Sequence, residues 1–411
     1  MSEILFLSHR IPFPPDRGDK IRSHHIVKRL ARIAPVHIAT FADDDIDMGE
    51  EVELAAMARS YRLVRRAKPL VLAGFQALGT GRPVSLTAFH DPQLAAYVEE
   101  VLANHPISAI YVFSGQMGQY VPAAYAGRVV VDFVDVDSAK FEAYAAKRNG
   151  VVRWIDAREA RLLQQEEARL AGRADVSLLI SDEEAALFRS RLSAQQRELA
   201  DVRVLANGID SAWFDPGEVE AEPDLRAFAY PRLIFTGQMD YRPNIDASLR
   251  VAEKILPAIR AKFPDASFHI VGRNPAAEVL ERHEVDGCHV WGRVPDMRTW
   301  LKGADLAIVP LTIARGVQNK VLEAMAMVLP VVLTPGAATG IGGIDGQQLA
   351  IASRDEDLAA AAIDLLSDAR RGRMMGLAAR RFVCEEKSWQ AALAPLADIL
   401  GWTTRATRHA A

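Results

Sequence analysis

Two charged residues three positions apart give the first indication of a ligand site. Lys320 and Glu323 fall within the segment G-V-Q-N-K-V-L-E-A-M-A, which begins at Gly316 and has the pattern of a loop followed by a helix. A spacing of three places both side chains on one helix face, so they can address a single ligand. A cation beside phosphate and a carboxylate beside hydroxyl groups would suit a sugar–phosphate compound such as a nucleotide. The same spacing also fits a solvated ion pair, and local physics leaves both interpretations open.

The elements around this segment are those of a parallel sheet. The apolar run Leu306–Val309 is typical of a buried strand, a helix is expected from about Gln318 to Met327, and Pro330–Leu333 predicts the next strand. The loop 310–317 then lies at the carboxyl end of a strand, where such sheets bind ligands. Gly316 permits close approach of the backbone to a ligand, and the free N–H groups at the helix start favour an anion.

A similar arrangement occurs near the amino terminus. The strand expected at Ile4–Leu7 is followed by a proline-containing loop, by Gly18, and by a helix from Asp19 to about Ile33. The helix start offers a second place for phosphate, and Lys20 and Arg22 add positive charge there. Basic residues on a first helical turn are also commonly just solvated, so this signal is weak by itself.

Apolar runs alternate with helical patterns along the rest of the chain, which predicts doubly wound parallel sheets. The further strands are expected at Val36–Phe41, Tyr61–Val64, Ile110–Phe113, Val129–Phe133, Asp175–Ile180, Val202–Leu205, Arg232–Thr236, Phe268–Val271 and His289–Trp291. The further helices are expected at Glu50–Arg59, Pro69–Leu78, Pro92–Ala103, Ser138–Ala171 with an interruption at Asn149-Gly150, Asn244–Lys262, Asp355–Leu366, Ala369–Val383 and Trp389–Leu400.

Polar groups follow several of these strands. Gly237 ends one strand of the second half, and Gly272 with Arg273 ends another, at the same predicted edge of the sheet. In the first half, Asp135 belongs to a D-F-V-D-V-D-S segment whose carboxylates could be catalytic, could bind hydroxyl groups, or could cap the next helix; Asp137 or Ser138 is a natural N-cap.

The whole-chain composition bounds the protein's class. A length of 411 residues suggests two domains, and a composition that is 50% hydrophobic and 25% charged supports a large core. A formal net charge of −4 argues against nucleic-acid binding. The two cysteines, Cys288 and Cys384, have no metal-ligand spacing and imply no disulfide framework, which favours the cytoplasm. No apolar stretch is long enough to span a bilayer, and the first residues have the pattern of a strand rather than of a signal peptide.

Four motifs in order resemble the retaining, GT-B-fold glycosyltransferases of family 4, in particular a bacterial branch found with exopolysaccharide and exosortase gene systems. The segment that begins at Gly316 is similar to the donor-site signature of that family. The other three are P-F-P-P-D-R-G-D-K-I-R from Pro12, N-G-I-D from Asn207, and F-T-G-Q-M-D-Y-R-P-N-I-D-A from Phe235. The resemblance covers nearly the whole chain.

The resemblance implies two Rossmann-like domains of doubly wound parallel sheet that face a central crevice. Residues 1–210 would bind the acceptor, residues 211–388 would bind the nucleotide-sugar, and residues 389–411 would form a C-terminal helix and tail that crosses back to the first domain. The implied reaction is hexosyl transfer with retention, from a UDP-, GDP- or ADP-linked sugar to a glycan or lipid-linked acceptor, without a cofactor or metal ion. Peripheral contact with the inner face of the membrane would fit such an acceptor.

The resemblance also implies roles for individual residues. Asp135 would contact the acceptor or act as a base, Glu323 would bind the donor ribose, and Arg315 would contact sugar or diphosphate. The donor-binding residues would be Gly18, Lys20, Arg22, Gly237, Arg242, Gly272, Arg273, Gly316, Val317, Gln318, Lys320 and Glu323, together with Arg293 and Val294 through main-chain contacts to the nucleobase.

The sequence departs from the family pattern at three positions. Arg315 occupies the place of the first glutamate of the usual E-x7-E pair, while Glu323 fits the second. Gln238 and Asn244 stand where the family has the arginine and lysine of its pyrophosphate clamp, so Arg242, Arg315 and Lys320 would have to supply the charge. Two alternatives therefore stay open: a nucleotide-sugar epimerase on the same fold, and a non-catalytic binding partner derived from a transferase.

Overall fold

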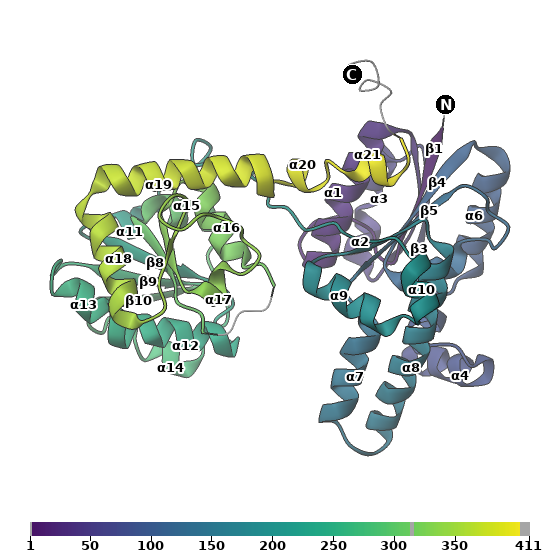
Figure 1. Cartoon of the computed structure of the whole chain (residues 1–411), viewed down its shortest axis with the longest axis horizontal. Coiled ribbons are helices and arrows are strands. Elements are labelled where there is room, and N and C mark those ends of the chain that lie inside the picture. Colours follow the sequence, from purple (N-terminus) through teal and green to yellow (C-terminus); the bar gives the residue numbers. More distant parts are fainter. Residues whose placement is uncertain (1, 313–315, 403–411) are drawn as a thin grey trace. The chain divides into compact units, whose positions relative to one another are not determined.

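The computed structural model describes residues 2–312 and 316–402, and the chain divides into two compact units (Figure 1). The first unit comprises Met1–Asn207 together with the segment from Leu393 on, and the second comprises Gly208–Ala392. The division after Asn207 lies close to the boundary expected at residue 210. No helix in the described part of the chain is long and apolar enough to cross a membrane.

The first unit is built on a seven-stranded parallel sheet with the order β3-β2-β1-β4-β5-β6-β7. Its strands are β1 (Glu3–Ser8), β2 (Val36–Ala42), β3 (Ser60–Arg65), β4 (Ile107–Phe113), β5 (Arg128–Val134), β6 (Val176–Leu179) and β7 (Val202–Val204). The order reverses between β1 and β4, and parallel sheets of this type bind ligands beyond the carboxyl ends of the strands at such a point.

The helices of the first unit follow the predicted pattern. They are α1 (Gly18–Ile33), α2 (Asp45–Gly49), α3 (Glu51–Met57), α4 (Leu70–Thr80), α5 (Val84–Ala88), α6 (Pro92–Asn104), a 3-10 turn η1 (Gly115–Tyr120), α7 (Asp137–Lys147), α8 (Gly150–Arg173), α9 (Asp182–Arg191), α10 (Ala194–Leu199) and α21 (Leu396–Ile399). The interruption predicted at Asn149-Gly150 is confirmed, because Gly150 has a φ of 62° there, and α7 and α8 project from the sheet as a hairpin (Figure 1).

The second unit repeats the architecture with a six-stranded parallel sheet of order β10-β9-β8-β11-β12-β13. Its strands are β8 (Arg232–Thr236), β9 (Ser267–Val271), β10 (Cys288–Gly292), β11 (Leu306–Val309), β12 (Val331–Leu333) and β13 (Ala350–Ile351). The order reverses between β8 and β11, so the ligand-binding edge of this sheet is expected beyond those two strands.

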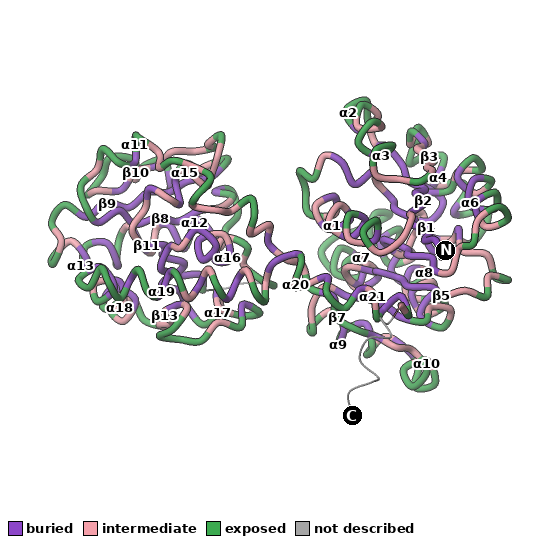
Figure 2. Tube along the Cα trace, turned by 90° about the horizontal axis from the view of Figure 1, so that it is seen from above, coloured by how far each residue is buried: buried purple, intermediate pink, exposed green. Residues whose placement is uncertain are grey.

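The helices of the second unit pack around its sheet. They are α11 (Pro223–Arg226), α12 (Arg242–Arg250), a π-helical turn η2 (Val251–Ile255), α13 (Leu256–Arg260), α14 (Ala277–Leu280), α15 (Met297–Gly303), α16 (Asn319–Ala326), α17 (Pro335–Ala338), α18 (Asp355–Ser367), α19 (Ala369–Phe382), a second π-helical turn η3 (Val383–Lys387) and α20 (Trp389–Ala392). In both units the strands form the buried centre and the outward helix faces are exposed (Figure 2). The predicted parallel α/β fold of the two halves is confirmed.

Two local predictions were wrong. The helix expected over Trp389–Leu400 is broken into α20 and α21, because Pro395 has no N–H group with which to continue a helical ladder. The helix α7 begins at Asp137 with Val136 as its N-cap residue, and no side chain caps it from that position. The carboxylate of Glu167 on α8 accepts the Ser138 N–H instead, at 2.9 Å.

Candidate functional site

A cavity of about 640 Å³ opens at the predicted ligand-binding edge of the second sheet. The loops that follow β8, β9 and β10 form one side of it, and the start of α16 forms the other. Its lining residues are Phe214, Thr236, Gly237, Gln238, Tyr241, Asn244, Gly272, Arg273, Arg293, Val294, Met297, Val317, Gln318, Asn319, Lys320 and Glu323. Eight of the predicted donor-binding residues besides Glu323 are in that set, namely Gly237, Gly272, Arg273, Arg293, Val294, Val317, Gln318 and Lys320.

Two glycines allow the loops on the β8 and β9 side to approach one another closely. A Cβ atom on Gly272 would lie 1.6 Å from the carbonyl oxygen of Gly237, so no other residue fits at position 272 without movement of the backbone. Gly237 itself has a φ of 152°, and a Cβ there would lie 2.8 Å from the Lys320 amine. Backbone hydrogen bonds hold these loops together. The Gly237 N–H donates to the Val271 carbonyl at 3.1 Å, and the Gly272 N–H donates to the Gly292 carbonyl at 2.8 Å. The floor of the cavity is therefore bare backbone.

The Lys320 amine is held over this floor by two contacts. It donates to Asn244 Oδ1 at 2.6 Å and lies 4.2 Å from the centre of the Phe235 ring, where a cation is attracted to the aromatic face. Asn244 is itself buried, and its amide nitrogen donates to the Gln238 carbonyl at 2.8 Å. Burial lowers the pKa of Lys320 to about 8, while the nearby Glu323 raises it. The Lys320 amine is thus held in place by Asn244 and Phe235, and it is still largely protonated near neutral pH. Among the described residues, it has no acidic hydrogen-bond partner.

Glu323 lies one turn further along α16 and lines the same cavity. Burial raises the pKa of its carboxyl group to about 7, and the Lys320 charge acts in the opposite direction. Among the described residues, none forms a hydrogen bond or an ion pair with the Glu323 carboxylate. A half-buried carboxylate that lacks a partner inside the protein is suited to accept hydrogen bonds from the hydroxyl groups of a ligand.

Two arginines provide further positive charge. Arg273 is exposed and donates to the Gln238 side chain at 3.0 Å, and it lies close enough to Asp240 to interact with that carboxylate. Arg293 is also exposed and forms no ion pair within the described residues. Both lie at the ends of strands and line the cavity. Together with Lys320 they give this region a positive character that suits a diphosphate.

Arg242 is held by ion pairs outside the cavity, and its role toward the donor stays a prediction. Its guanidinium forms ion pairs with Asp246 at 2.5 Å and Glu278 at 2.8 Å, and the residue is not among those that line the cavity. The reason lies in the helix: Asp246 is four residues away on the same face of α12, which makes it a natural partner. Gly316 adopts a φ of 65°, as a tight loop before a helix requires, but does not line the cavity either. Arg315 lies outside the described residues.

The structure places Lys20 and Arg22 inside the first unit, and their role toward a donor stays a prediction. Only 2% of Lys20 and 1% of Arg22 is exposed. The Lys20 amine forms an ion pair with Asp47 and donates to the Phe13 carbonyl at 3.0 Å. Arg22 forms an ion pair with Asp132 at 3.0 Å. Both cations are therefore neutralised by acidic residues of the first unit. Of the three donor-binding residues predicted in this unit, only Gly18 is exposed to solvent.

Asp135 lies just beyond β5, partly exposed, beside Asp137 and Glu167. The space that these residues line holds only about 10 Å³, so it is a packing gap rather than a binding site. Asp132 differs from its neighbour, since it is fully buried and also accepts a hydrogen bond from Tyr111 Oη at 2.8 Å. The role of Asp135 toward an acceptor stays a prediction.

A polar cluster missed by the sequence analysis occupies the point where the first sheet reverses. His9 follows β1 and stacks on Phe113 at the end of β4, with ring centres 5.9 Å apart. Arg10 donates to Asp19 at 2.6 Å, and the His9 ring lies 3.4 Å from the same carboxylate. These contacts hold the pKa of Asp19 well below its usual range, despite the opposing effect of burial. The position of His9 immediately after the first strand was a signal that could have identified it.

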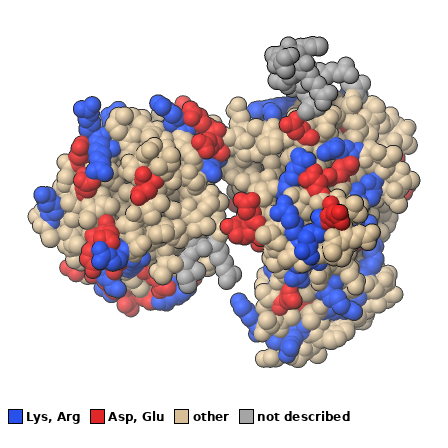
Figure 3. Space-filling view, viewed as in Figure 1, with Lys and Arg blue, Asp and Glu red and all other residues tan. Residues whose placement is uncertain are grey.

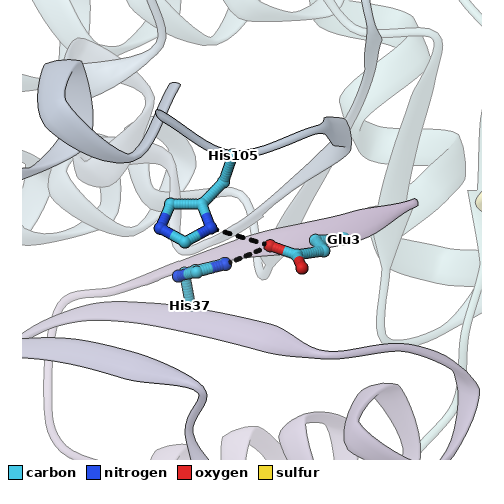
Figure 4. Close-up of side chains that lie close together, drawn as sticks. All are labelled: Glu3, His37 and His105. Atoms are coloured by element: carbon cyan, nitrogen blue, oxygen red, sulfur yellow. Dashed lines mark hydrogen bonds and ion pairs between the residues drawn. The ribbon is translucent and has the colours of Figure 1, made fainter. Parts of the chain in front are cut away.

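One group of side chains in the described residues has the composition of a metal site. Glu3, His37 and His105 lie together, and the Glu3 carboxylate is 2.7 Å from His37 Nε2 and 3.1 Å from His105 Nδ1 (Figure 4). Glu3 starts β1 and His37 is near the start of β2, so the group lies at the amino edge of the sheet, opposite the ligand-binding edge. Arg59 reaches the other carboxylate oxygen at 3.3 Å, and His37 Nδ1 lies 2.7 Å from Ser60 Oγ, so these polar atoms already have partners in the protein. The predicted absence of a metal stays a prediction.

Comparison with known proteins identifies relatives of both the sequence and the fold. Residues 230–368, which include most of the cavity, match the family model described as glycosyl transferases group 1. The chain is 25% identical to the GDP-mannose-dependent alpha-(1-6)-phosphatidylinositol monomannoside mannosyltransferase of Mycolicibacterium smegmatis, over 94% of this chain and 96% of that one. It is 29% identical to the phosphatidyl-myo-inositol mannosyltransferase of Propionibacterium freudenreichii over 40% of this chain and 39% of the relative.

Solved structures share the fold at lower identity. Anabaena Alr3699/HepE in complex with UDP superposes with a TM-score of 0.61 and 14% identity, covering 98% of this chain and 100% of that one. Sucrose-phosphate synthase from Thermosynechococcus elongatus superposes with a TM-score of 0.59 and 17% identity, covering 97% and 98%. Both matches extend over both units of the chain.

Proposed function

Because this chain is a glycosyltransferase with the GT-B fold, we propose that its second unit binds a nucleoside-diphosphate hexose in the cavity beside α16. The observation that supports this most directly is the pairing of Lys320 and Glu323. Both residues line one cavity. Among the described residues, the Lys320 amine has a neutral hydrogen-bond acceptor but no acidic one, and the Glu323 carboxylate has no hydrogen-bond partner. The diphosphate would lie against Lys320 and the glycine floor, and the ribose hydroxyls would donate to Glu323.

The leaving diphosphate would be stabilised by positive charge that is already in place. Lys320 at the start of α16 and the two exposed arginines, Arg273 and Arg293, would share its negative charge as the glycosidic bond breaks. The free N–H groups at the start of α16 would add to this effect. The backbone after β10, at Arg293 and Val294, would hold the nucleobase. We propose transfer with retention of configuration and without a metal ion, on the sequence resemblance alone.

The relatives suggest a donor and an acceptor to test first. The M. smegmatis relative is named for GDP-mannose and for a phosphatidylinositol mannoside. We therefore propose GDP-mannose as the first donor to test and a lipid-linked glycan as the acceptor class. The motif at Pro12, together with the other three, supports a role in exopolysaccharide or cell-surface polysaccharide synthesis.

Thermal unfolding with nucleotides tests the donor site. Wild-type protein and the Glu323→Ala variant would be heated with GDP, UDP, ADP and their hexose conjugates. A ligand at about 100 times its Kd stabilises the native state by about 2.7 kcal/mol. For a unit of this size, such stabilisation raises Tm by about 5–10 °C. A rise with one base only, which the variant loses, identifies the donor. The absence of any rise would indicate a non-catalytic partner instead.

Product analysis then separates the reaction classes. Incubation of the preferred nucleotide-hexose without acceptor should give slow hydrolysis or no reaction. Appearance of an epimerised nucleotide-sugar would identify an isomerase and refute transfer. With a lipid-linked acceptor, the anomeric configuration of the product reports whether the configuration is retained.

A further inference from the structure

The helix α4 in the first unit has an unusual surface. Its sequence, L-V-L-A-G-F-Q-A-L-G-T, contains no charged residue, yet most of its large side chains face solvent. Val71 is 72% exposed and Phe75 is 68% exposed, while the buried positions of the helix are the small residues Ala73 and Ala77. A surface helix normally buries its large apolar side chains and exposes its polar ones. This helix has the reverse arrangement.

The end of the α7–α8 hairpin shows the same property. Every residue from 146 to 155 is exposed, and the segment contains Val151, Val152, Trp154 and Ile155. Val151 is 74% exposed and Trp154 is 57% exposed. The tip therefore presents a tryptophan and three branched aliphatic side chains to solvent at the most projecting part of the unit (Figure 1).

The two apolar segments are neighbours. Arg158 on α8 donates to the Ala77 carbonyl in α4 at 2.7 Å and to the Arg82 carbonyl just beyond it. Val151, Trp154 and Arg158 share one face of α8 because they are spaced by three and four residues. Val151 and Trp154 thus lie on the side of α8 that faces α4. We call α4 and residues 146–155 together the apolar surface.

The sequence of the apolar surface is rich in basic residues and contains no acidic one. The chain has no Asp or Glu from Leu54 to His90 and none from Ala143 to Ile155, although its formal net charge is −4. The hairpin end contains Lys147, Arg148 and Arg153. Among the described residues, Lys147 and Arg153 have no ion-pair partner. Figure 3 shows this end of the unit as mostly uncharged surface with groups of lysine and arginine side chains and a smaller acidic group.

We propose that the apolar surface docks the enzyme on the anionic leaflet of a membrane, with α4 and Trp154 inserted at the level of the lipid headgroups. Apolar side chains that are bordered by free lysines and arginines match a negatively charged lipid surface in both hydrophobicity and charge. A contiguous exposed apolar area of this kind marks an interaction site rather than ordinary surface. The choice of a membrane rests on the proposed lipid-linked acceptor, which would be reached in the plane of that leaflet.

Vesicle sedimentation of the full chain tests the proposal. The vesicles would contain phosphatidylcholine alone or phosphatidylcholine mixed with phosphatidylglycerol. Wild-type protein should sediment with the mixed vesicles at low salt, and less with neutral vesicles or at high salt. The double variant Phe75→Ser, Trp154→Ser should bind the mixed vesicles about tenfold more weakly or worse, because two large side chains leave the interface. The variant Arg153→Gln should bind about fivefold more weakly.

The matched control is Leu199→Ser, which removes an apolar side chain that is 77% exposed on α10, outside the apolar surface. It should bind vesicles as the wild type does. The thermal shift with the preferred nucleotide should be unchanged in all of these variants, which shows that they are folded. That shift also tests the donor site independently, so a failure of the proposed function is visible apart from a failure of membrane docking.

Three results would overturn the proposal. Equal binding of wild type and double variant to mixed vesicles, or no binding by either, would show that the apolar surface does not contact lipid. If light scattering without vesicles shows a dimer in the wild type and a monomer in the double variant, the surface is instead an interface between two copies of the chain.

Discussion

Replacement of Glu323 by glutamine should stabilise the protein while it weakens the response to nucleotide. Burial raises the pKa of this carboxyl group from its ordinary value of 4.5 to about 7. Between these two values the folded chain retains the proton that the unfolded chain has lost, so the stability of the fold decreases as the pH rises from about 4.5 to about 7. Above pH 7 the folded protein bears the full free-energy cost of ionising the buried Glu323 carboxyl group, which corresponds to about 3 kcal/mol. Glutamine has nearly the same shape and no charge, so it removes that cost.

The expected gain is at most about 3 kcal/mol, or about 6–12 °C in Tm for a unit of this size, slightly above neutral pH. Near pH 4 the carboxyl group is protonated in both states, and the variant should unfold with the wild type. Differential scanning calorimetry across this pH range measures the difference. Because ribose hydroxyls would lose their ionised acceptor, the same variant should show a smaller nucleotide-induced rise in Tm. A residue that costs stability and is needed for ligand binding has the signature of a functional group.

Glu167 provides a matched control. Burial raises the pKa of its carboxyl group to about 7 as well, but this carboxylate accepts hydrogen bonds from both the N–H and the hydroxyl of Ser138. Glutamine can accept only through one oxygen, so Glu167→Gln should destabilise the first unit by about 1–3 kcal/mol. If Glu323→Gln also lowers Tm above neutral pH, or if its gain persists at pH 4, the carboxylate is a structural group and the reasoning fails.

Three further predictions concern the same cavity. Gly272→Ala should destabilise the second unit by about 3 kcal/mol or more and abolish nucleotide binding, because its Cβ would meet the Gly237 carbonyl at 1.6 Å; chemical denaturation and nucleotide titration measure both effects. Arg293→Ala should weaken nucleoside-diphosphate binding about tenfold and reduce its salt dependence, whereas Arg242→Ala should change neither; equal losses in calorimetric titration would contradict the charge assignment. Nucleotide affinity should increase as the pH rises toward 7, where Glu323 ionises, and this increase should be absent in Glu323→Gln.

The local sequence predicted most of the framework. Strand β8 at Arg232–Thr236 and strand β11 at Leu306–Val309 have the predicted bounds, because each is a short apolar run between polar loops. The cavity beside α16 was predictable for the same reason, since its residues follow strand ends or belong to one local motif. The burial of two cations depends instead on distant partners: Lys20 pairs with Asp47 across 27 positions and Arg22 with Asp132 across 110. No local pattern shows that such a cation will be buried.

Two neutral residues stand at the clamp positions of the family that the sequence resembles, and each of them contacts a cation of the cavity. Gln238 accepts a hydrogen bond from Arg273, and Asn244 accepts one from Lys320. If position 238 or 244 carried a cation, Arg273 or Lys320 would lose its hydrogen-bond acceptor. The new cation would also repel the positive charge of that neighbour. The positive charge has therefore not been lost with the clamp; it is provided by the loop after β9 and the start of α16, and the neutral amides orient it. The neutral residues Gln238 and Asn244, which suggested a degenerate site in the sequence, are therefore also compatible with a site whose positive charge comes from other residues.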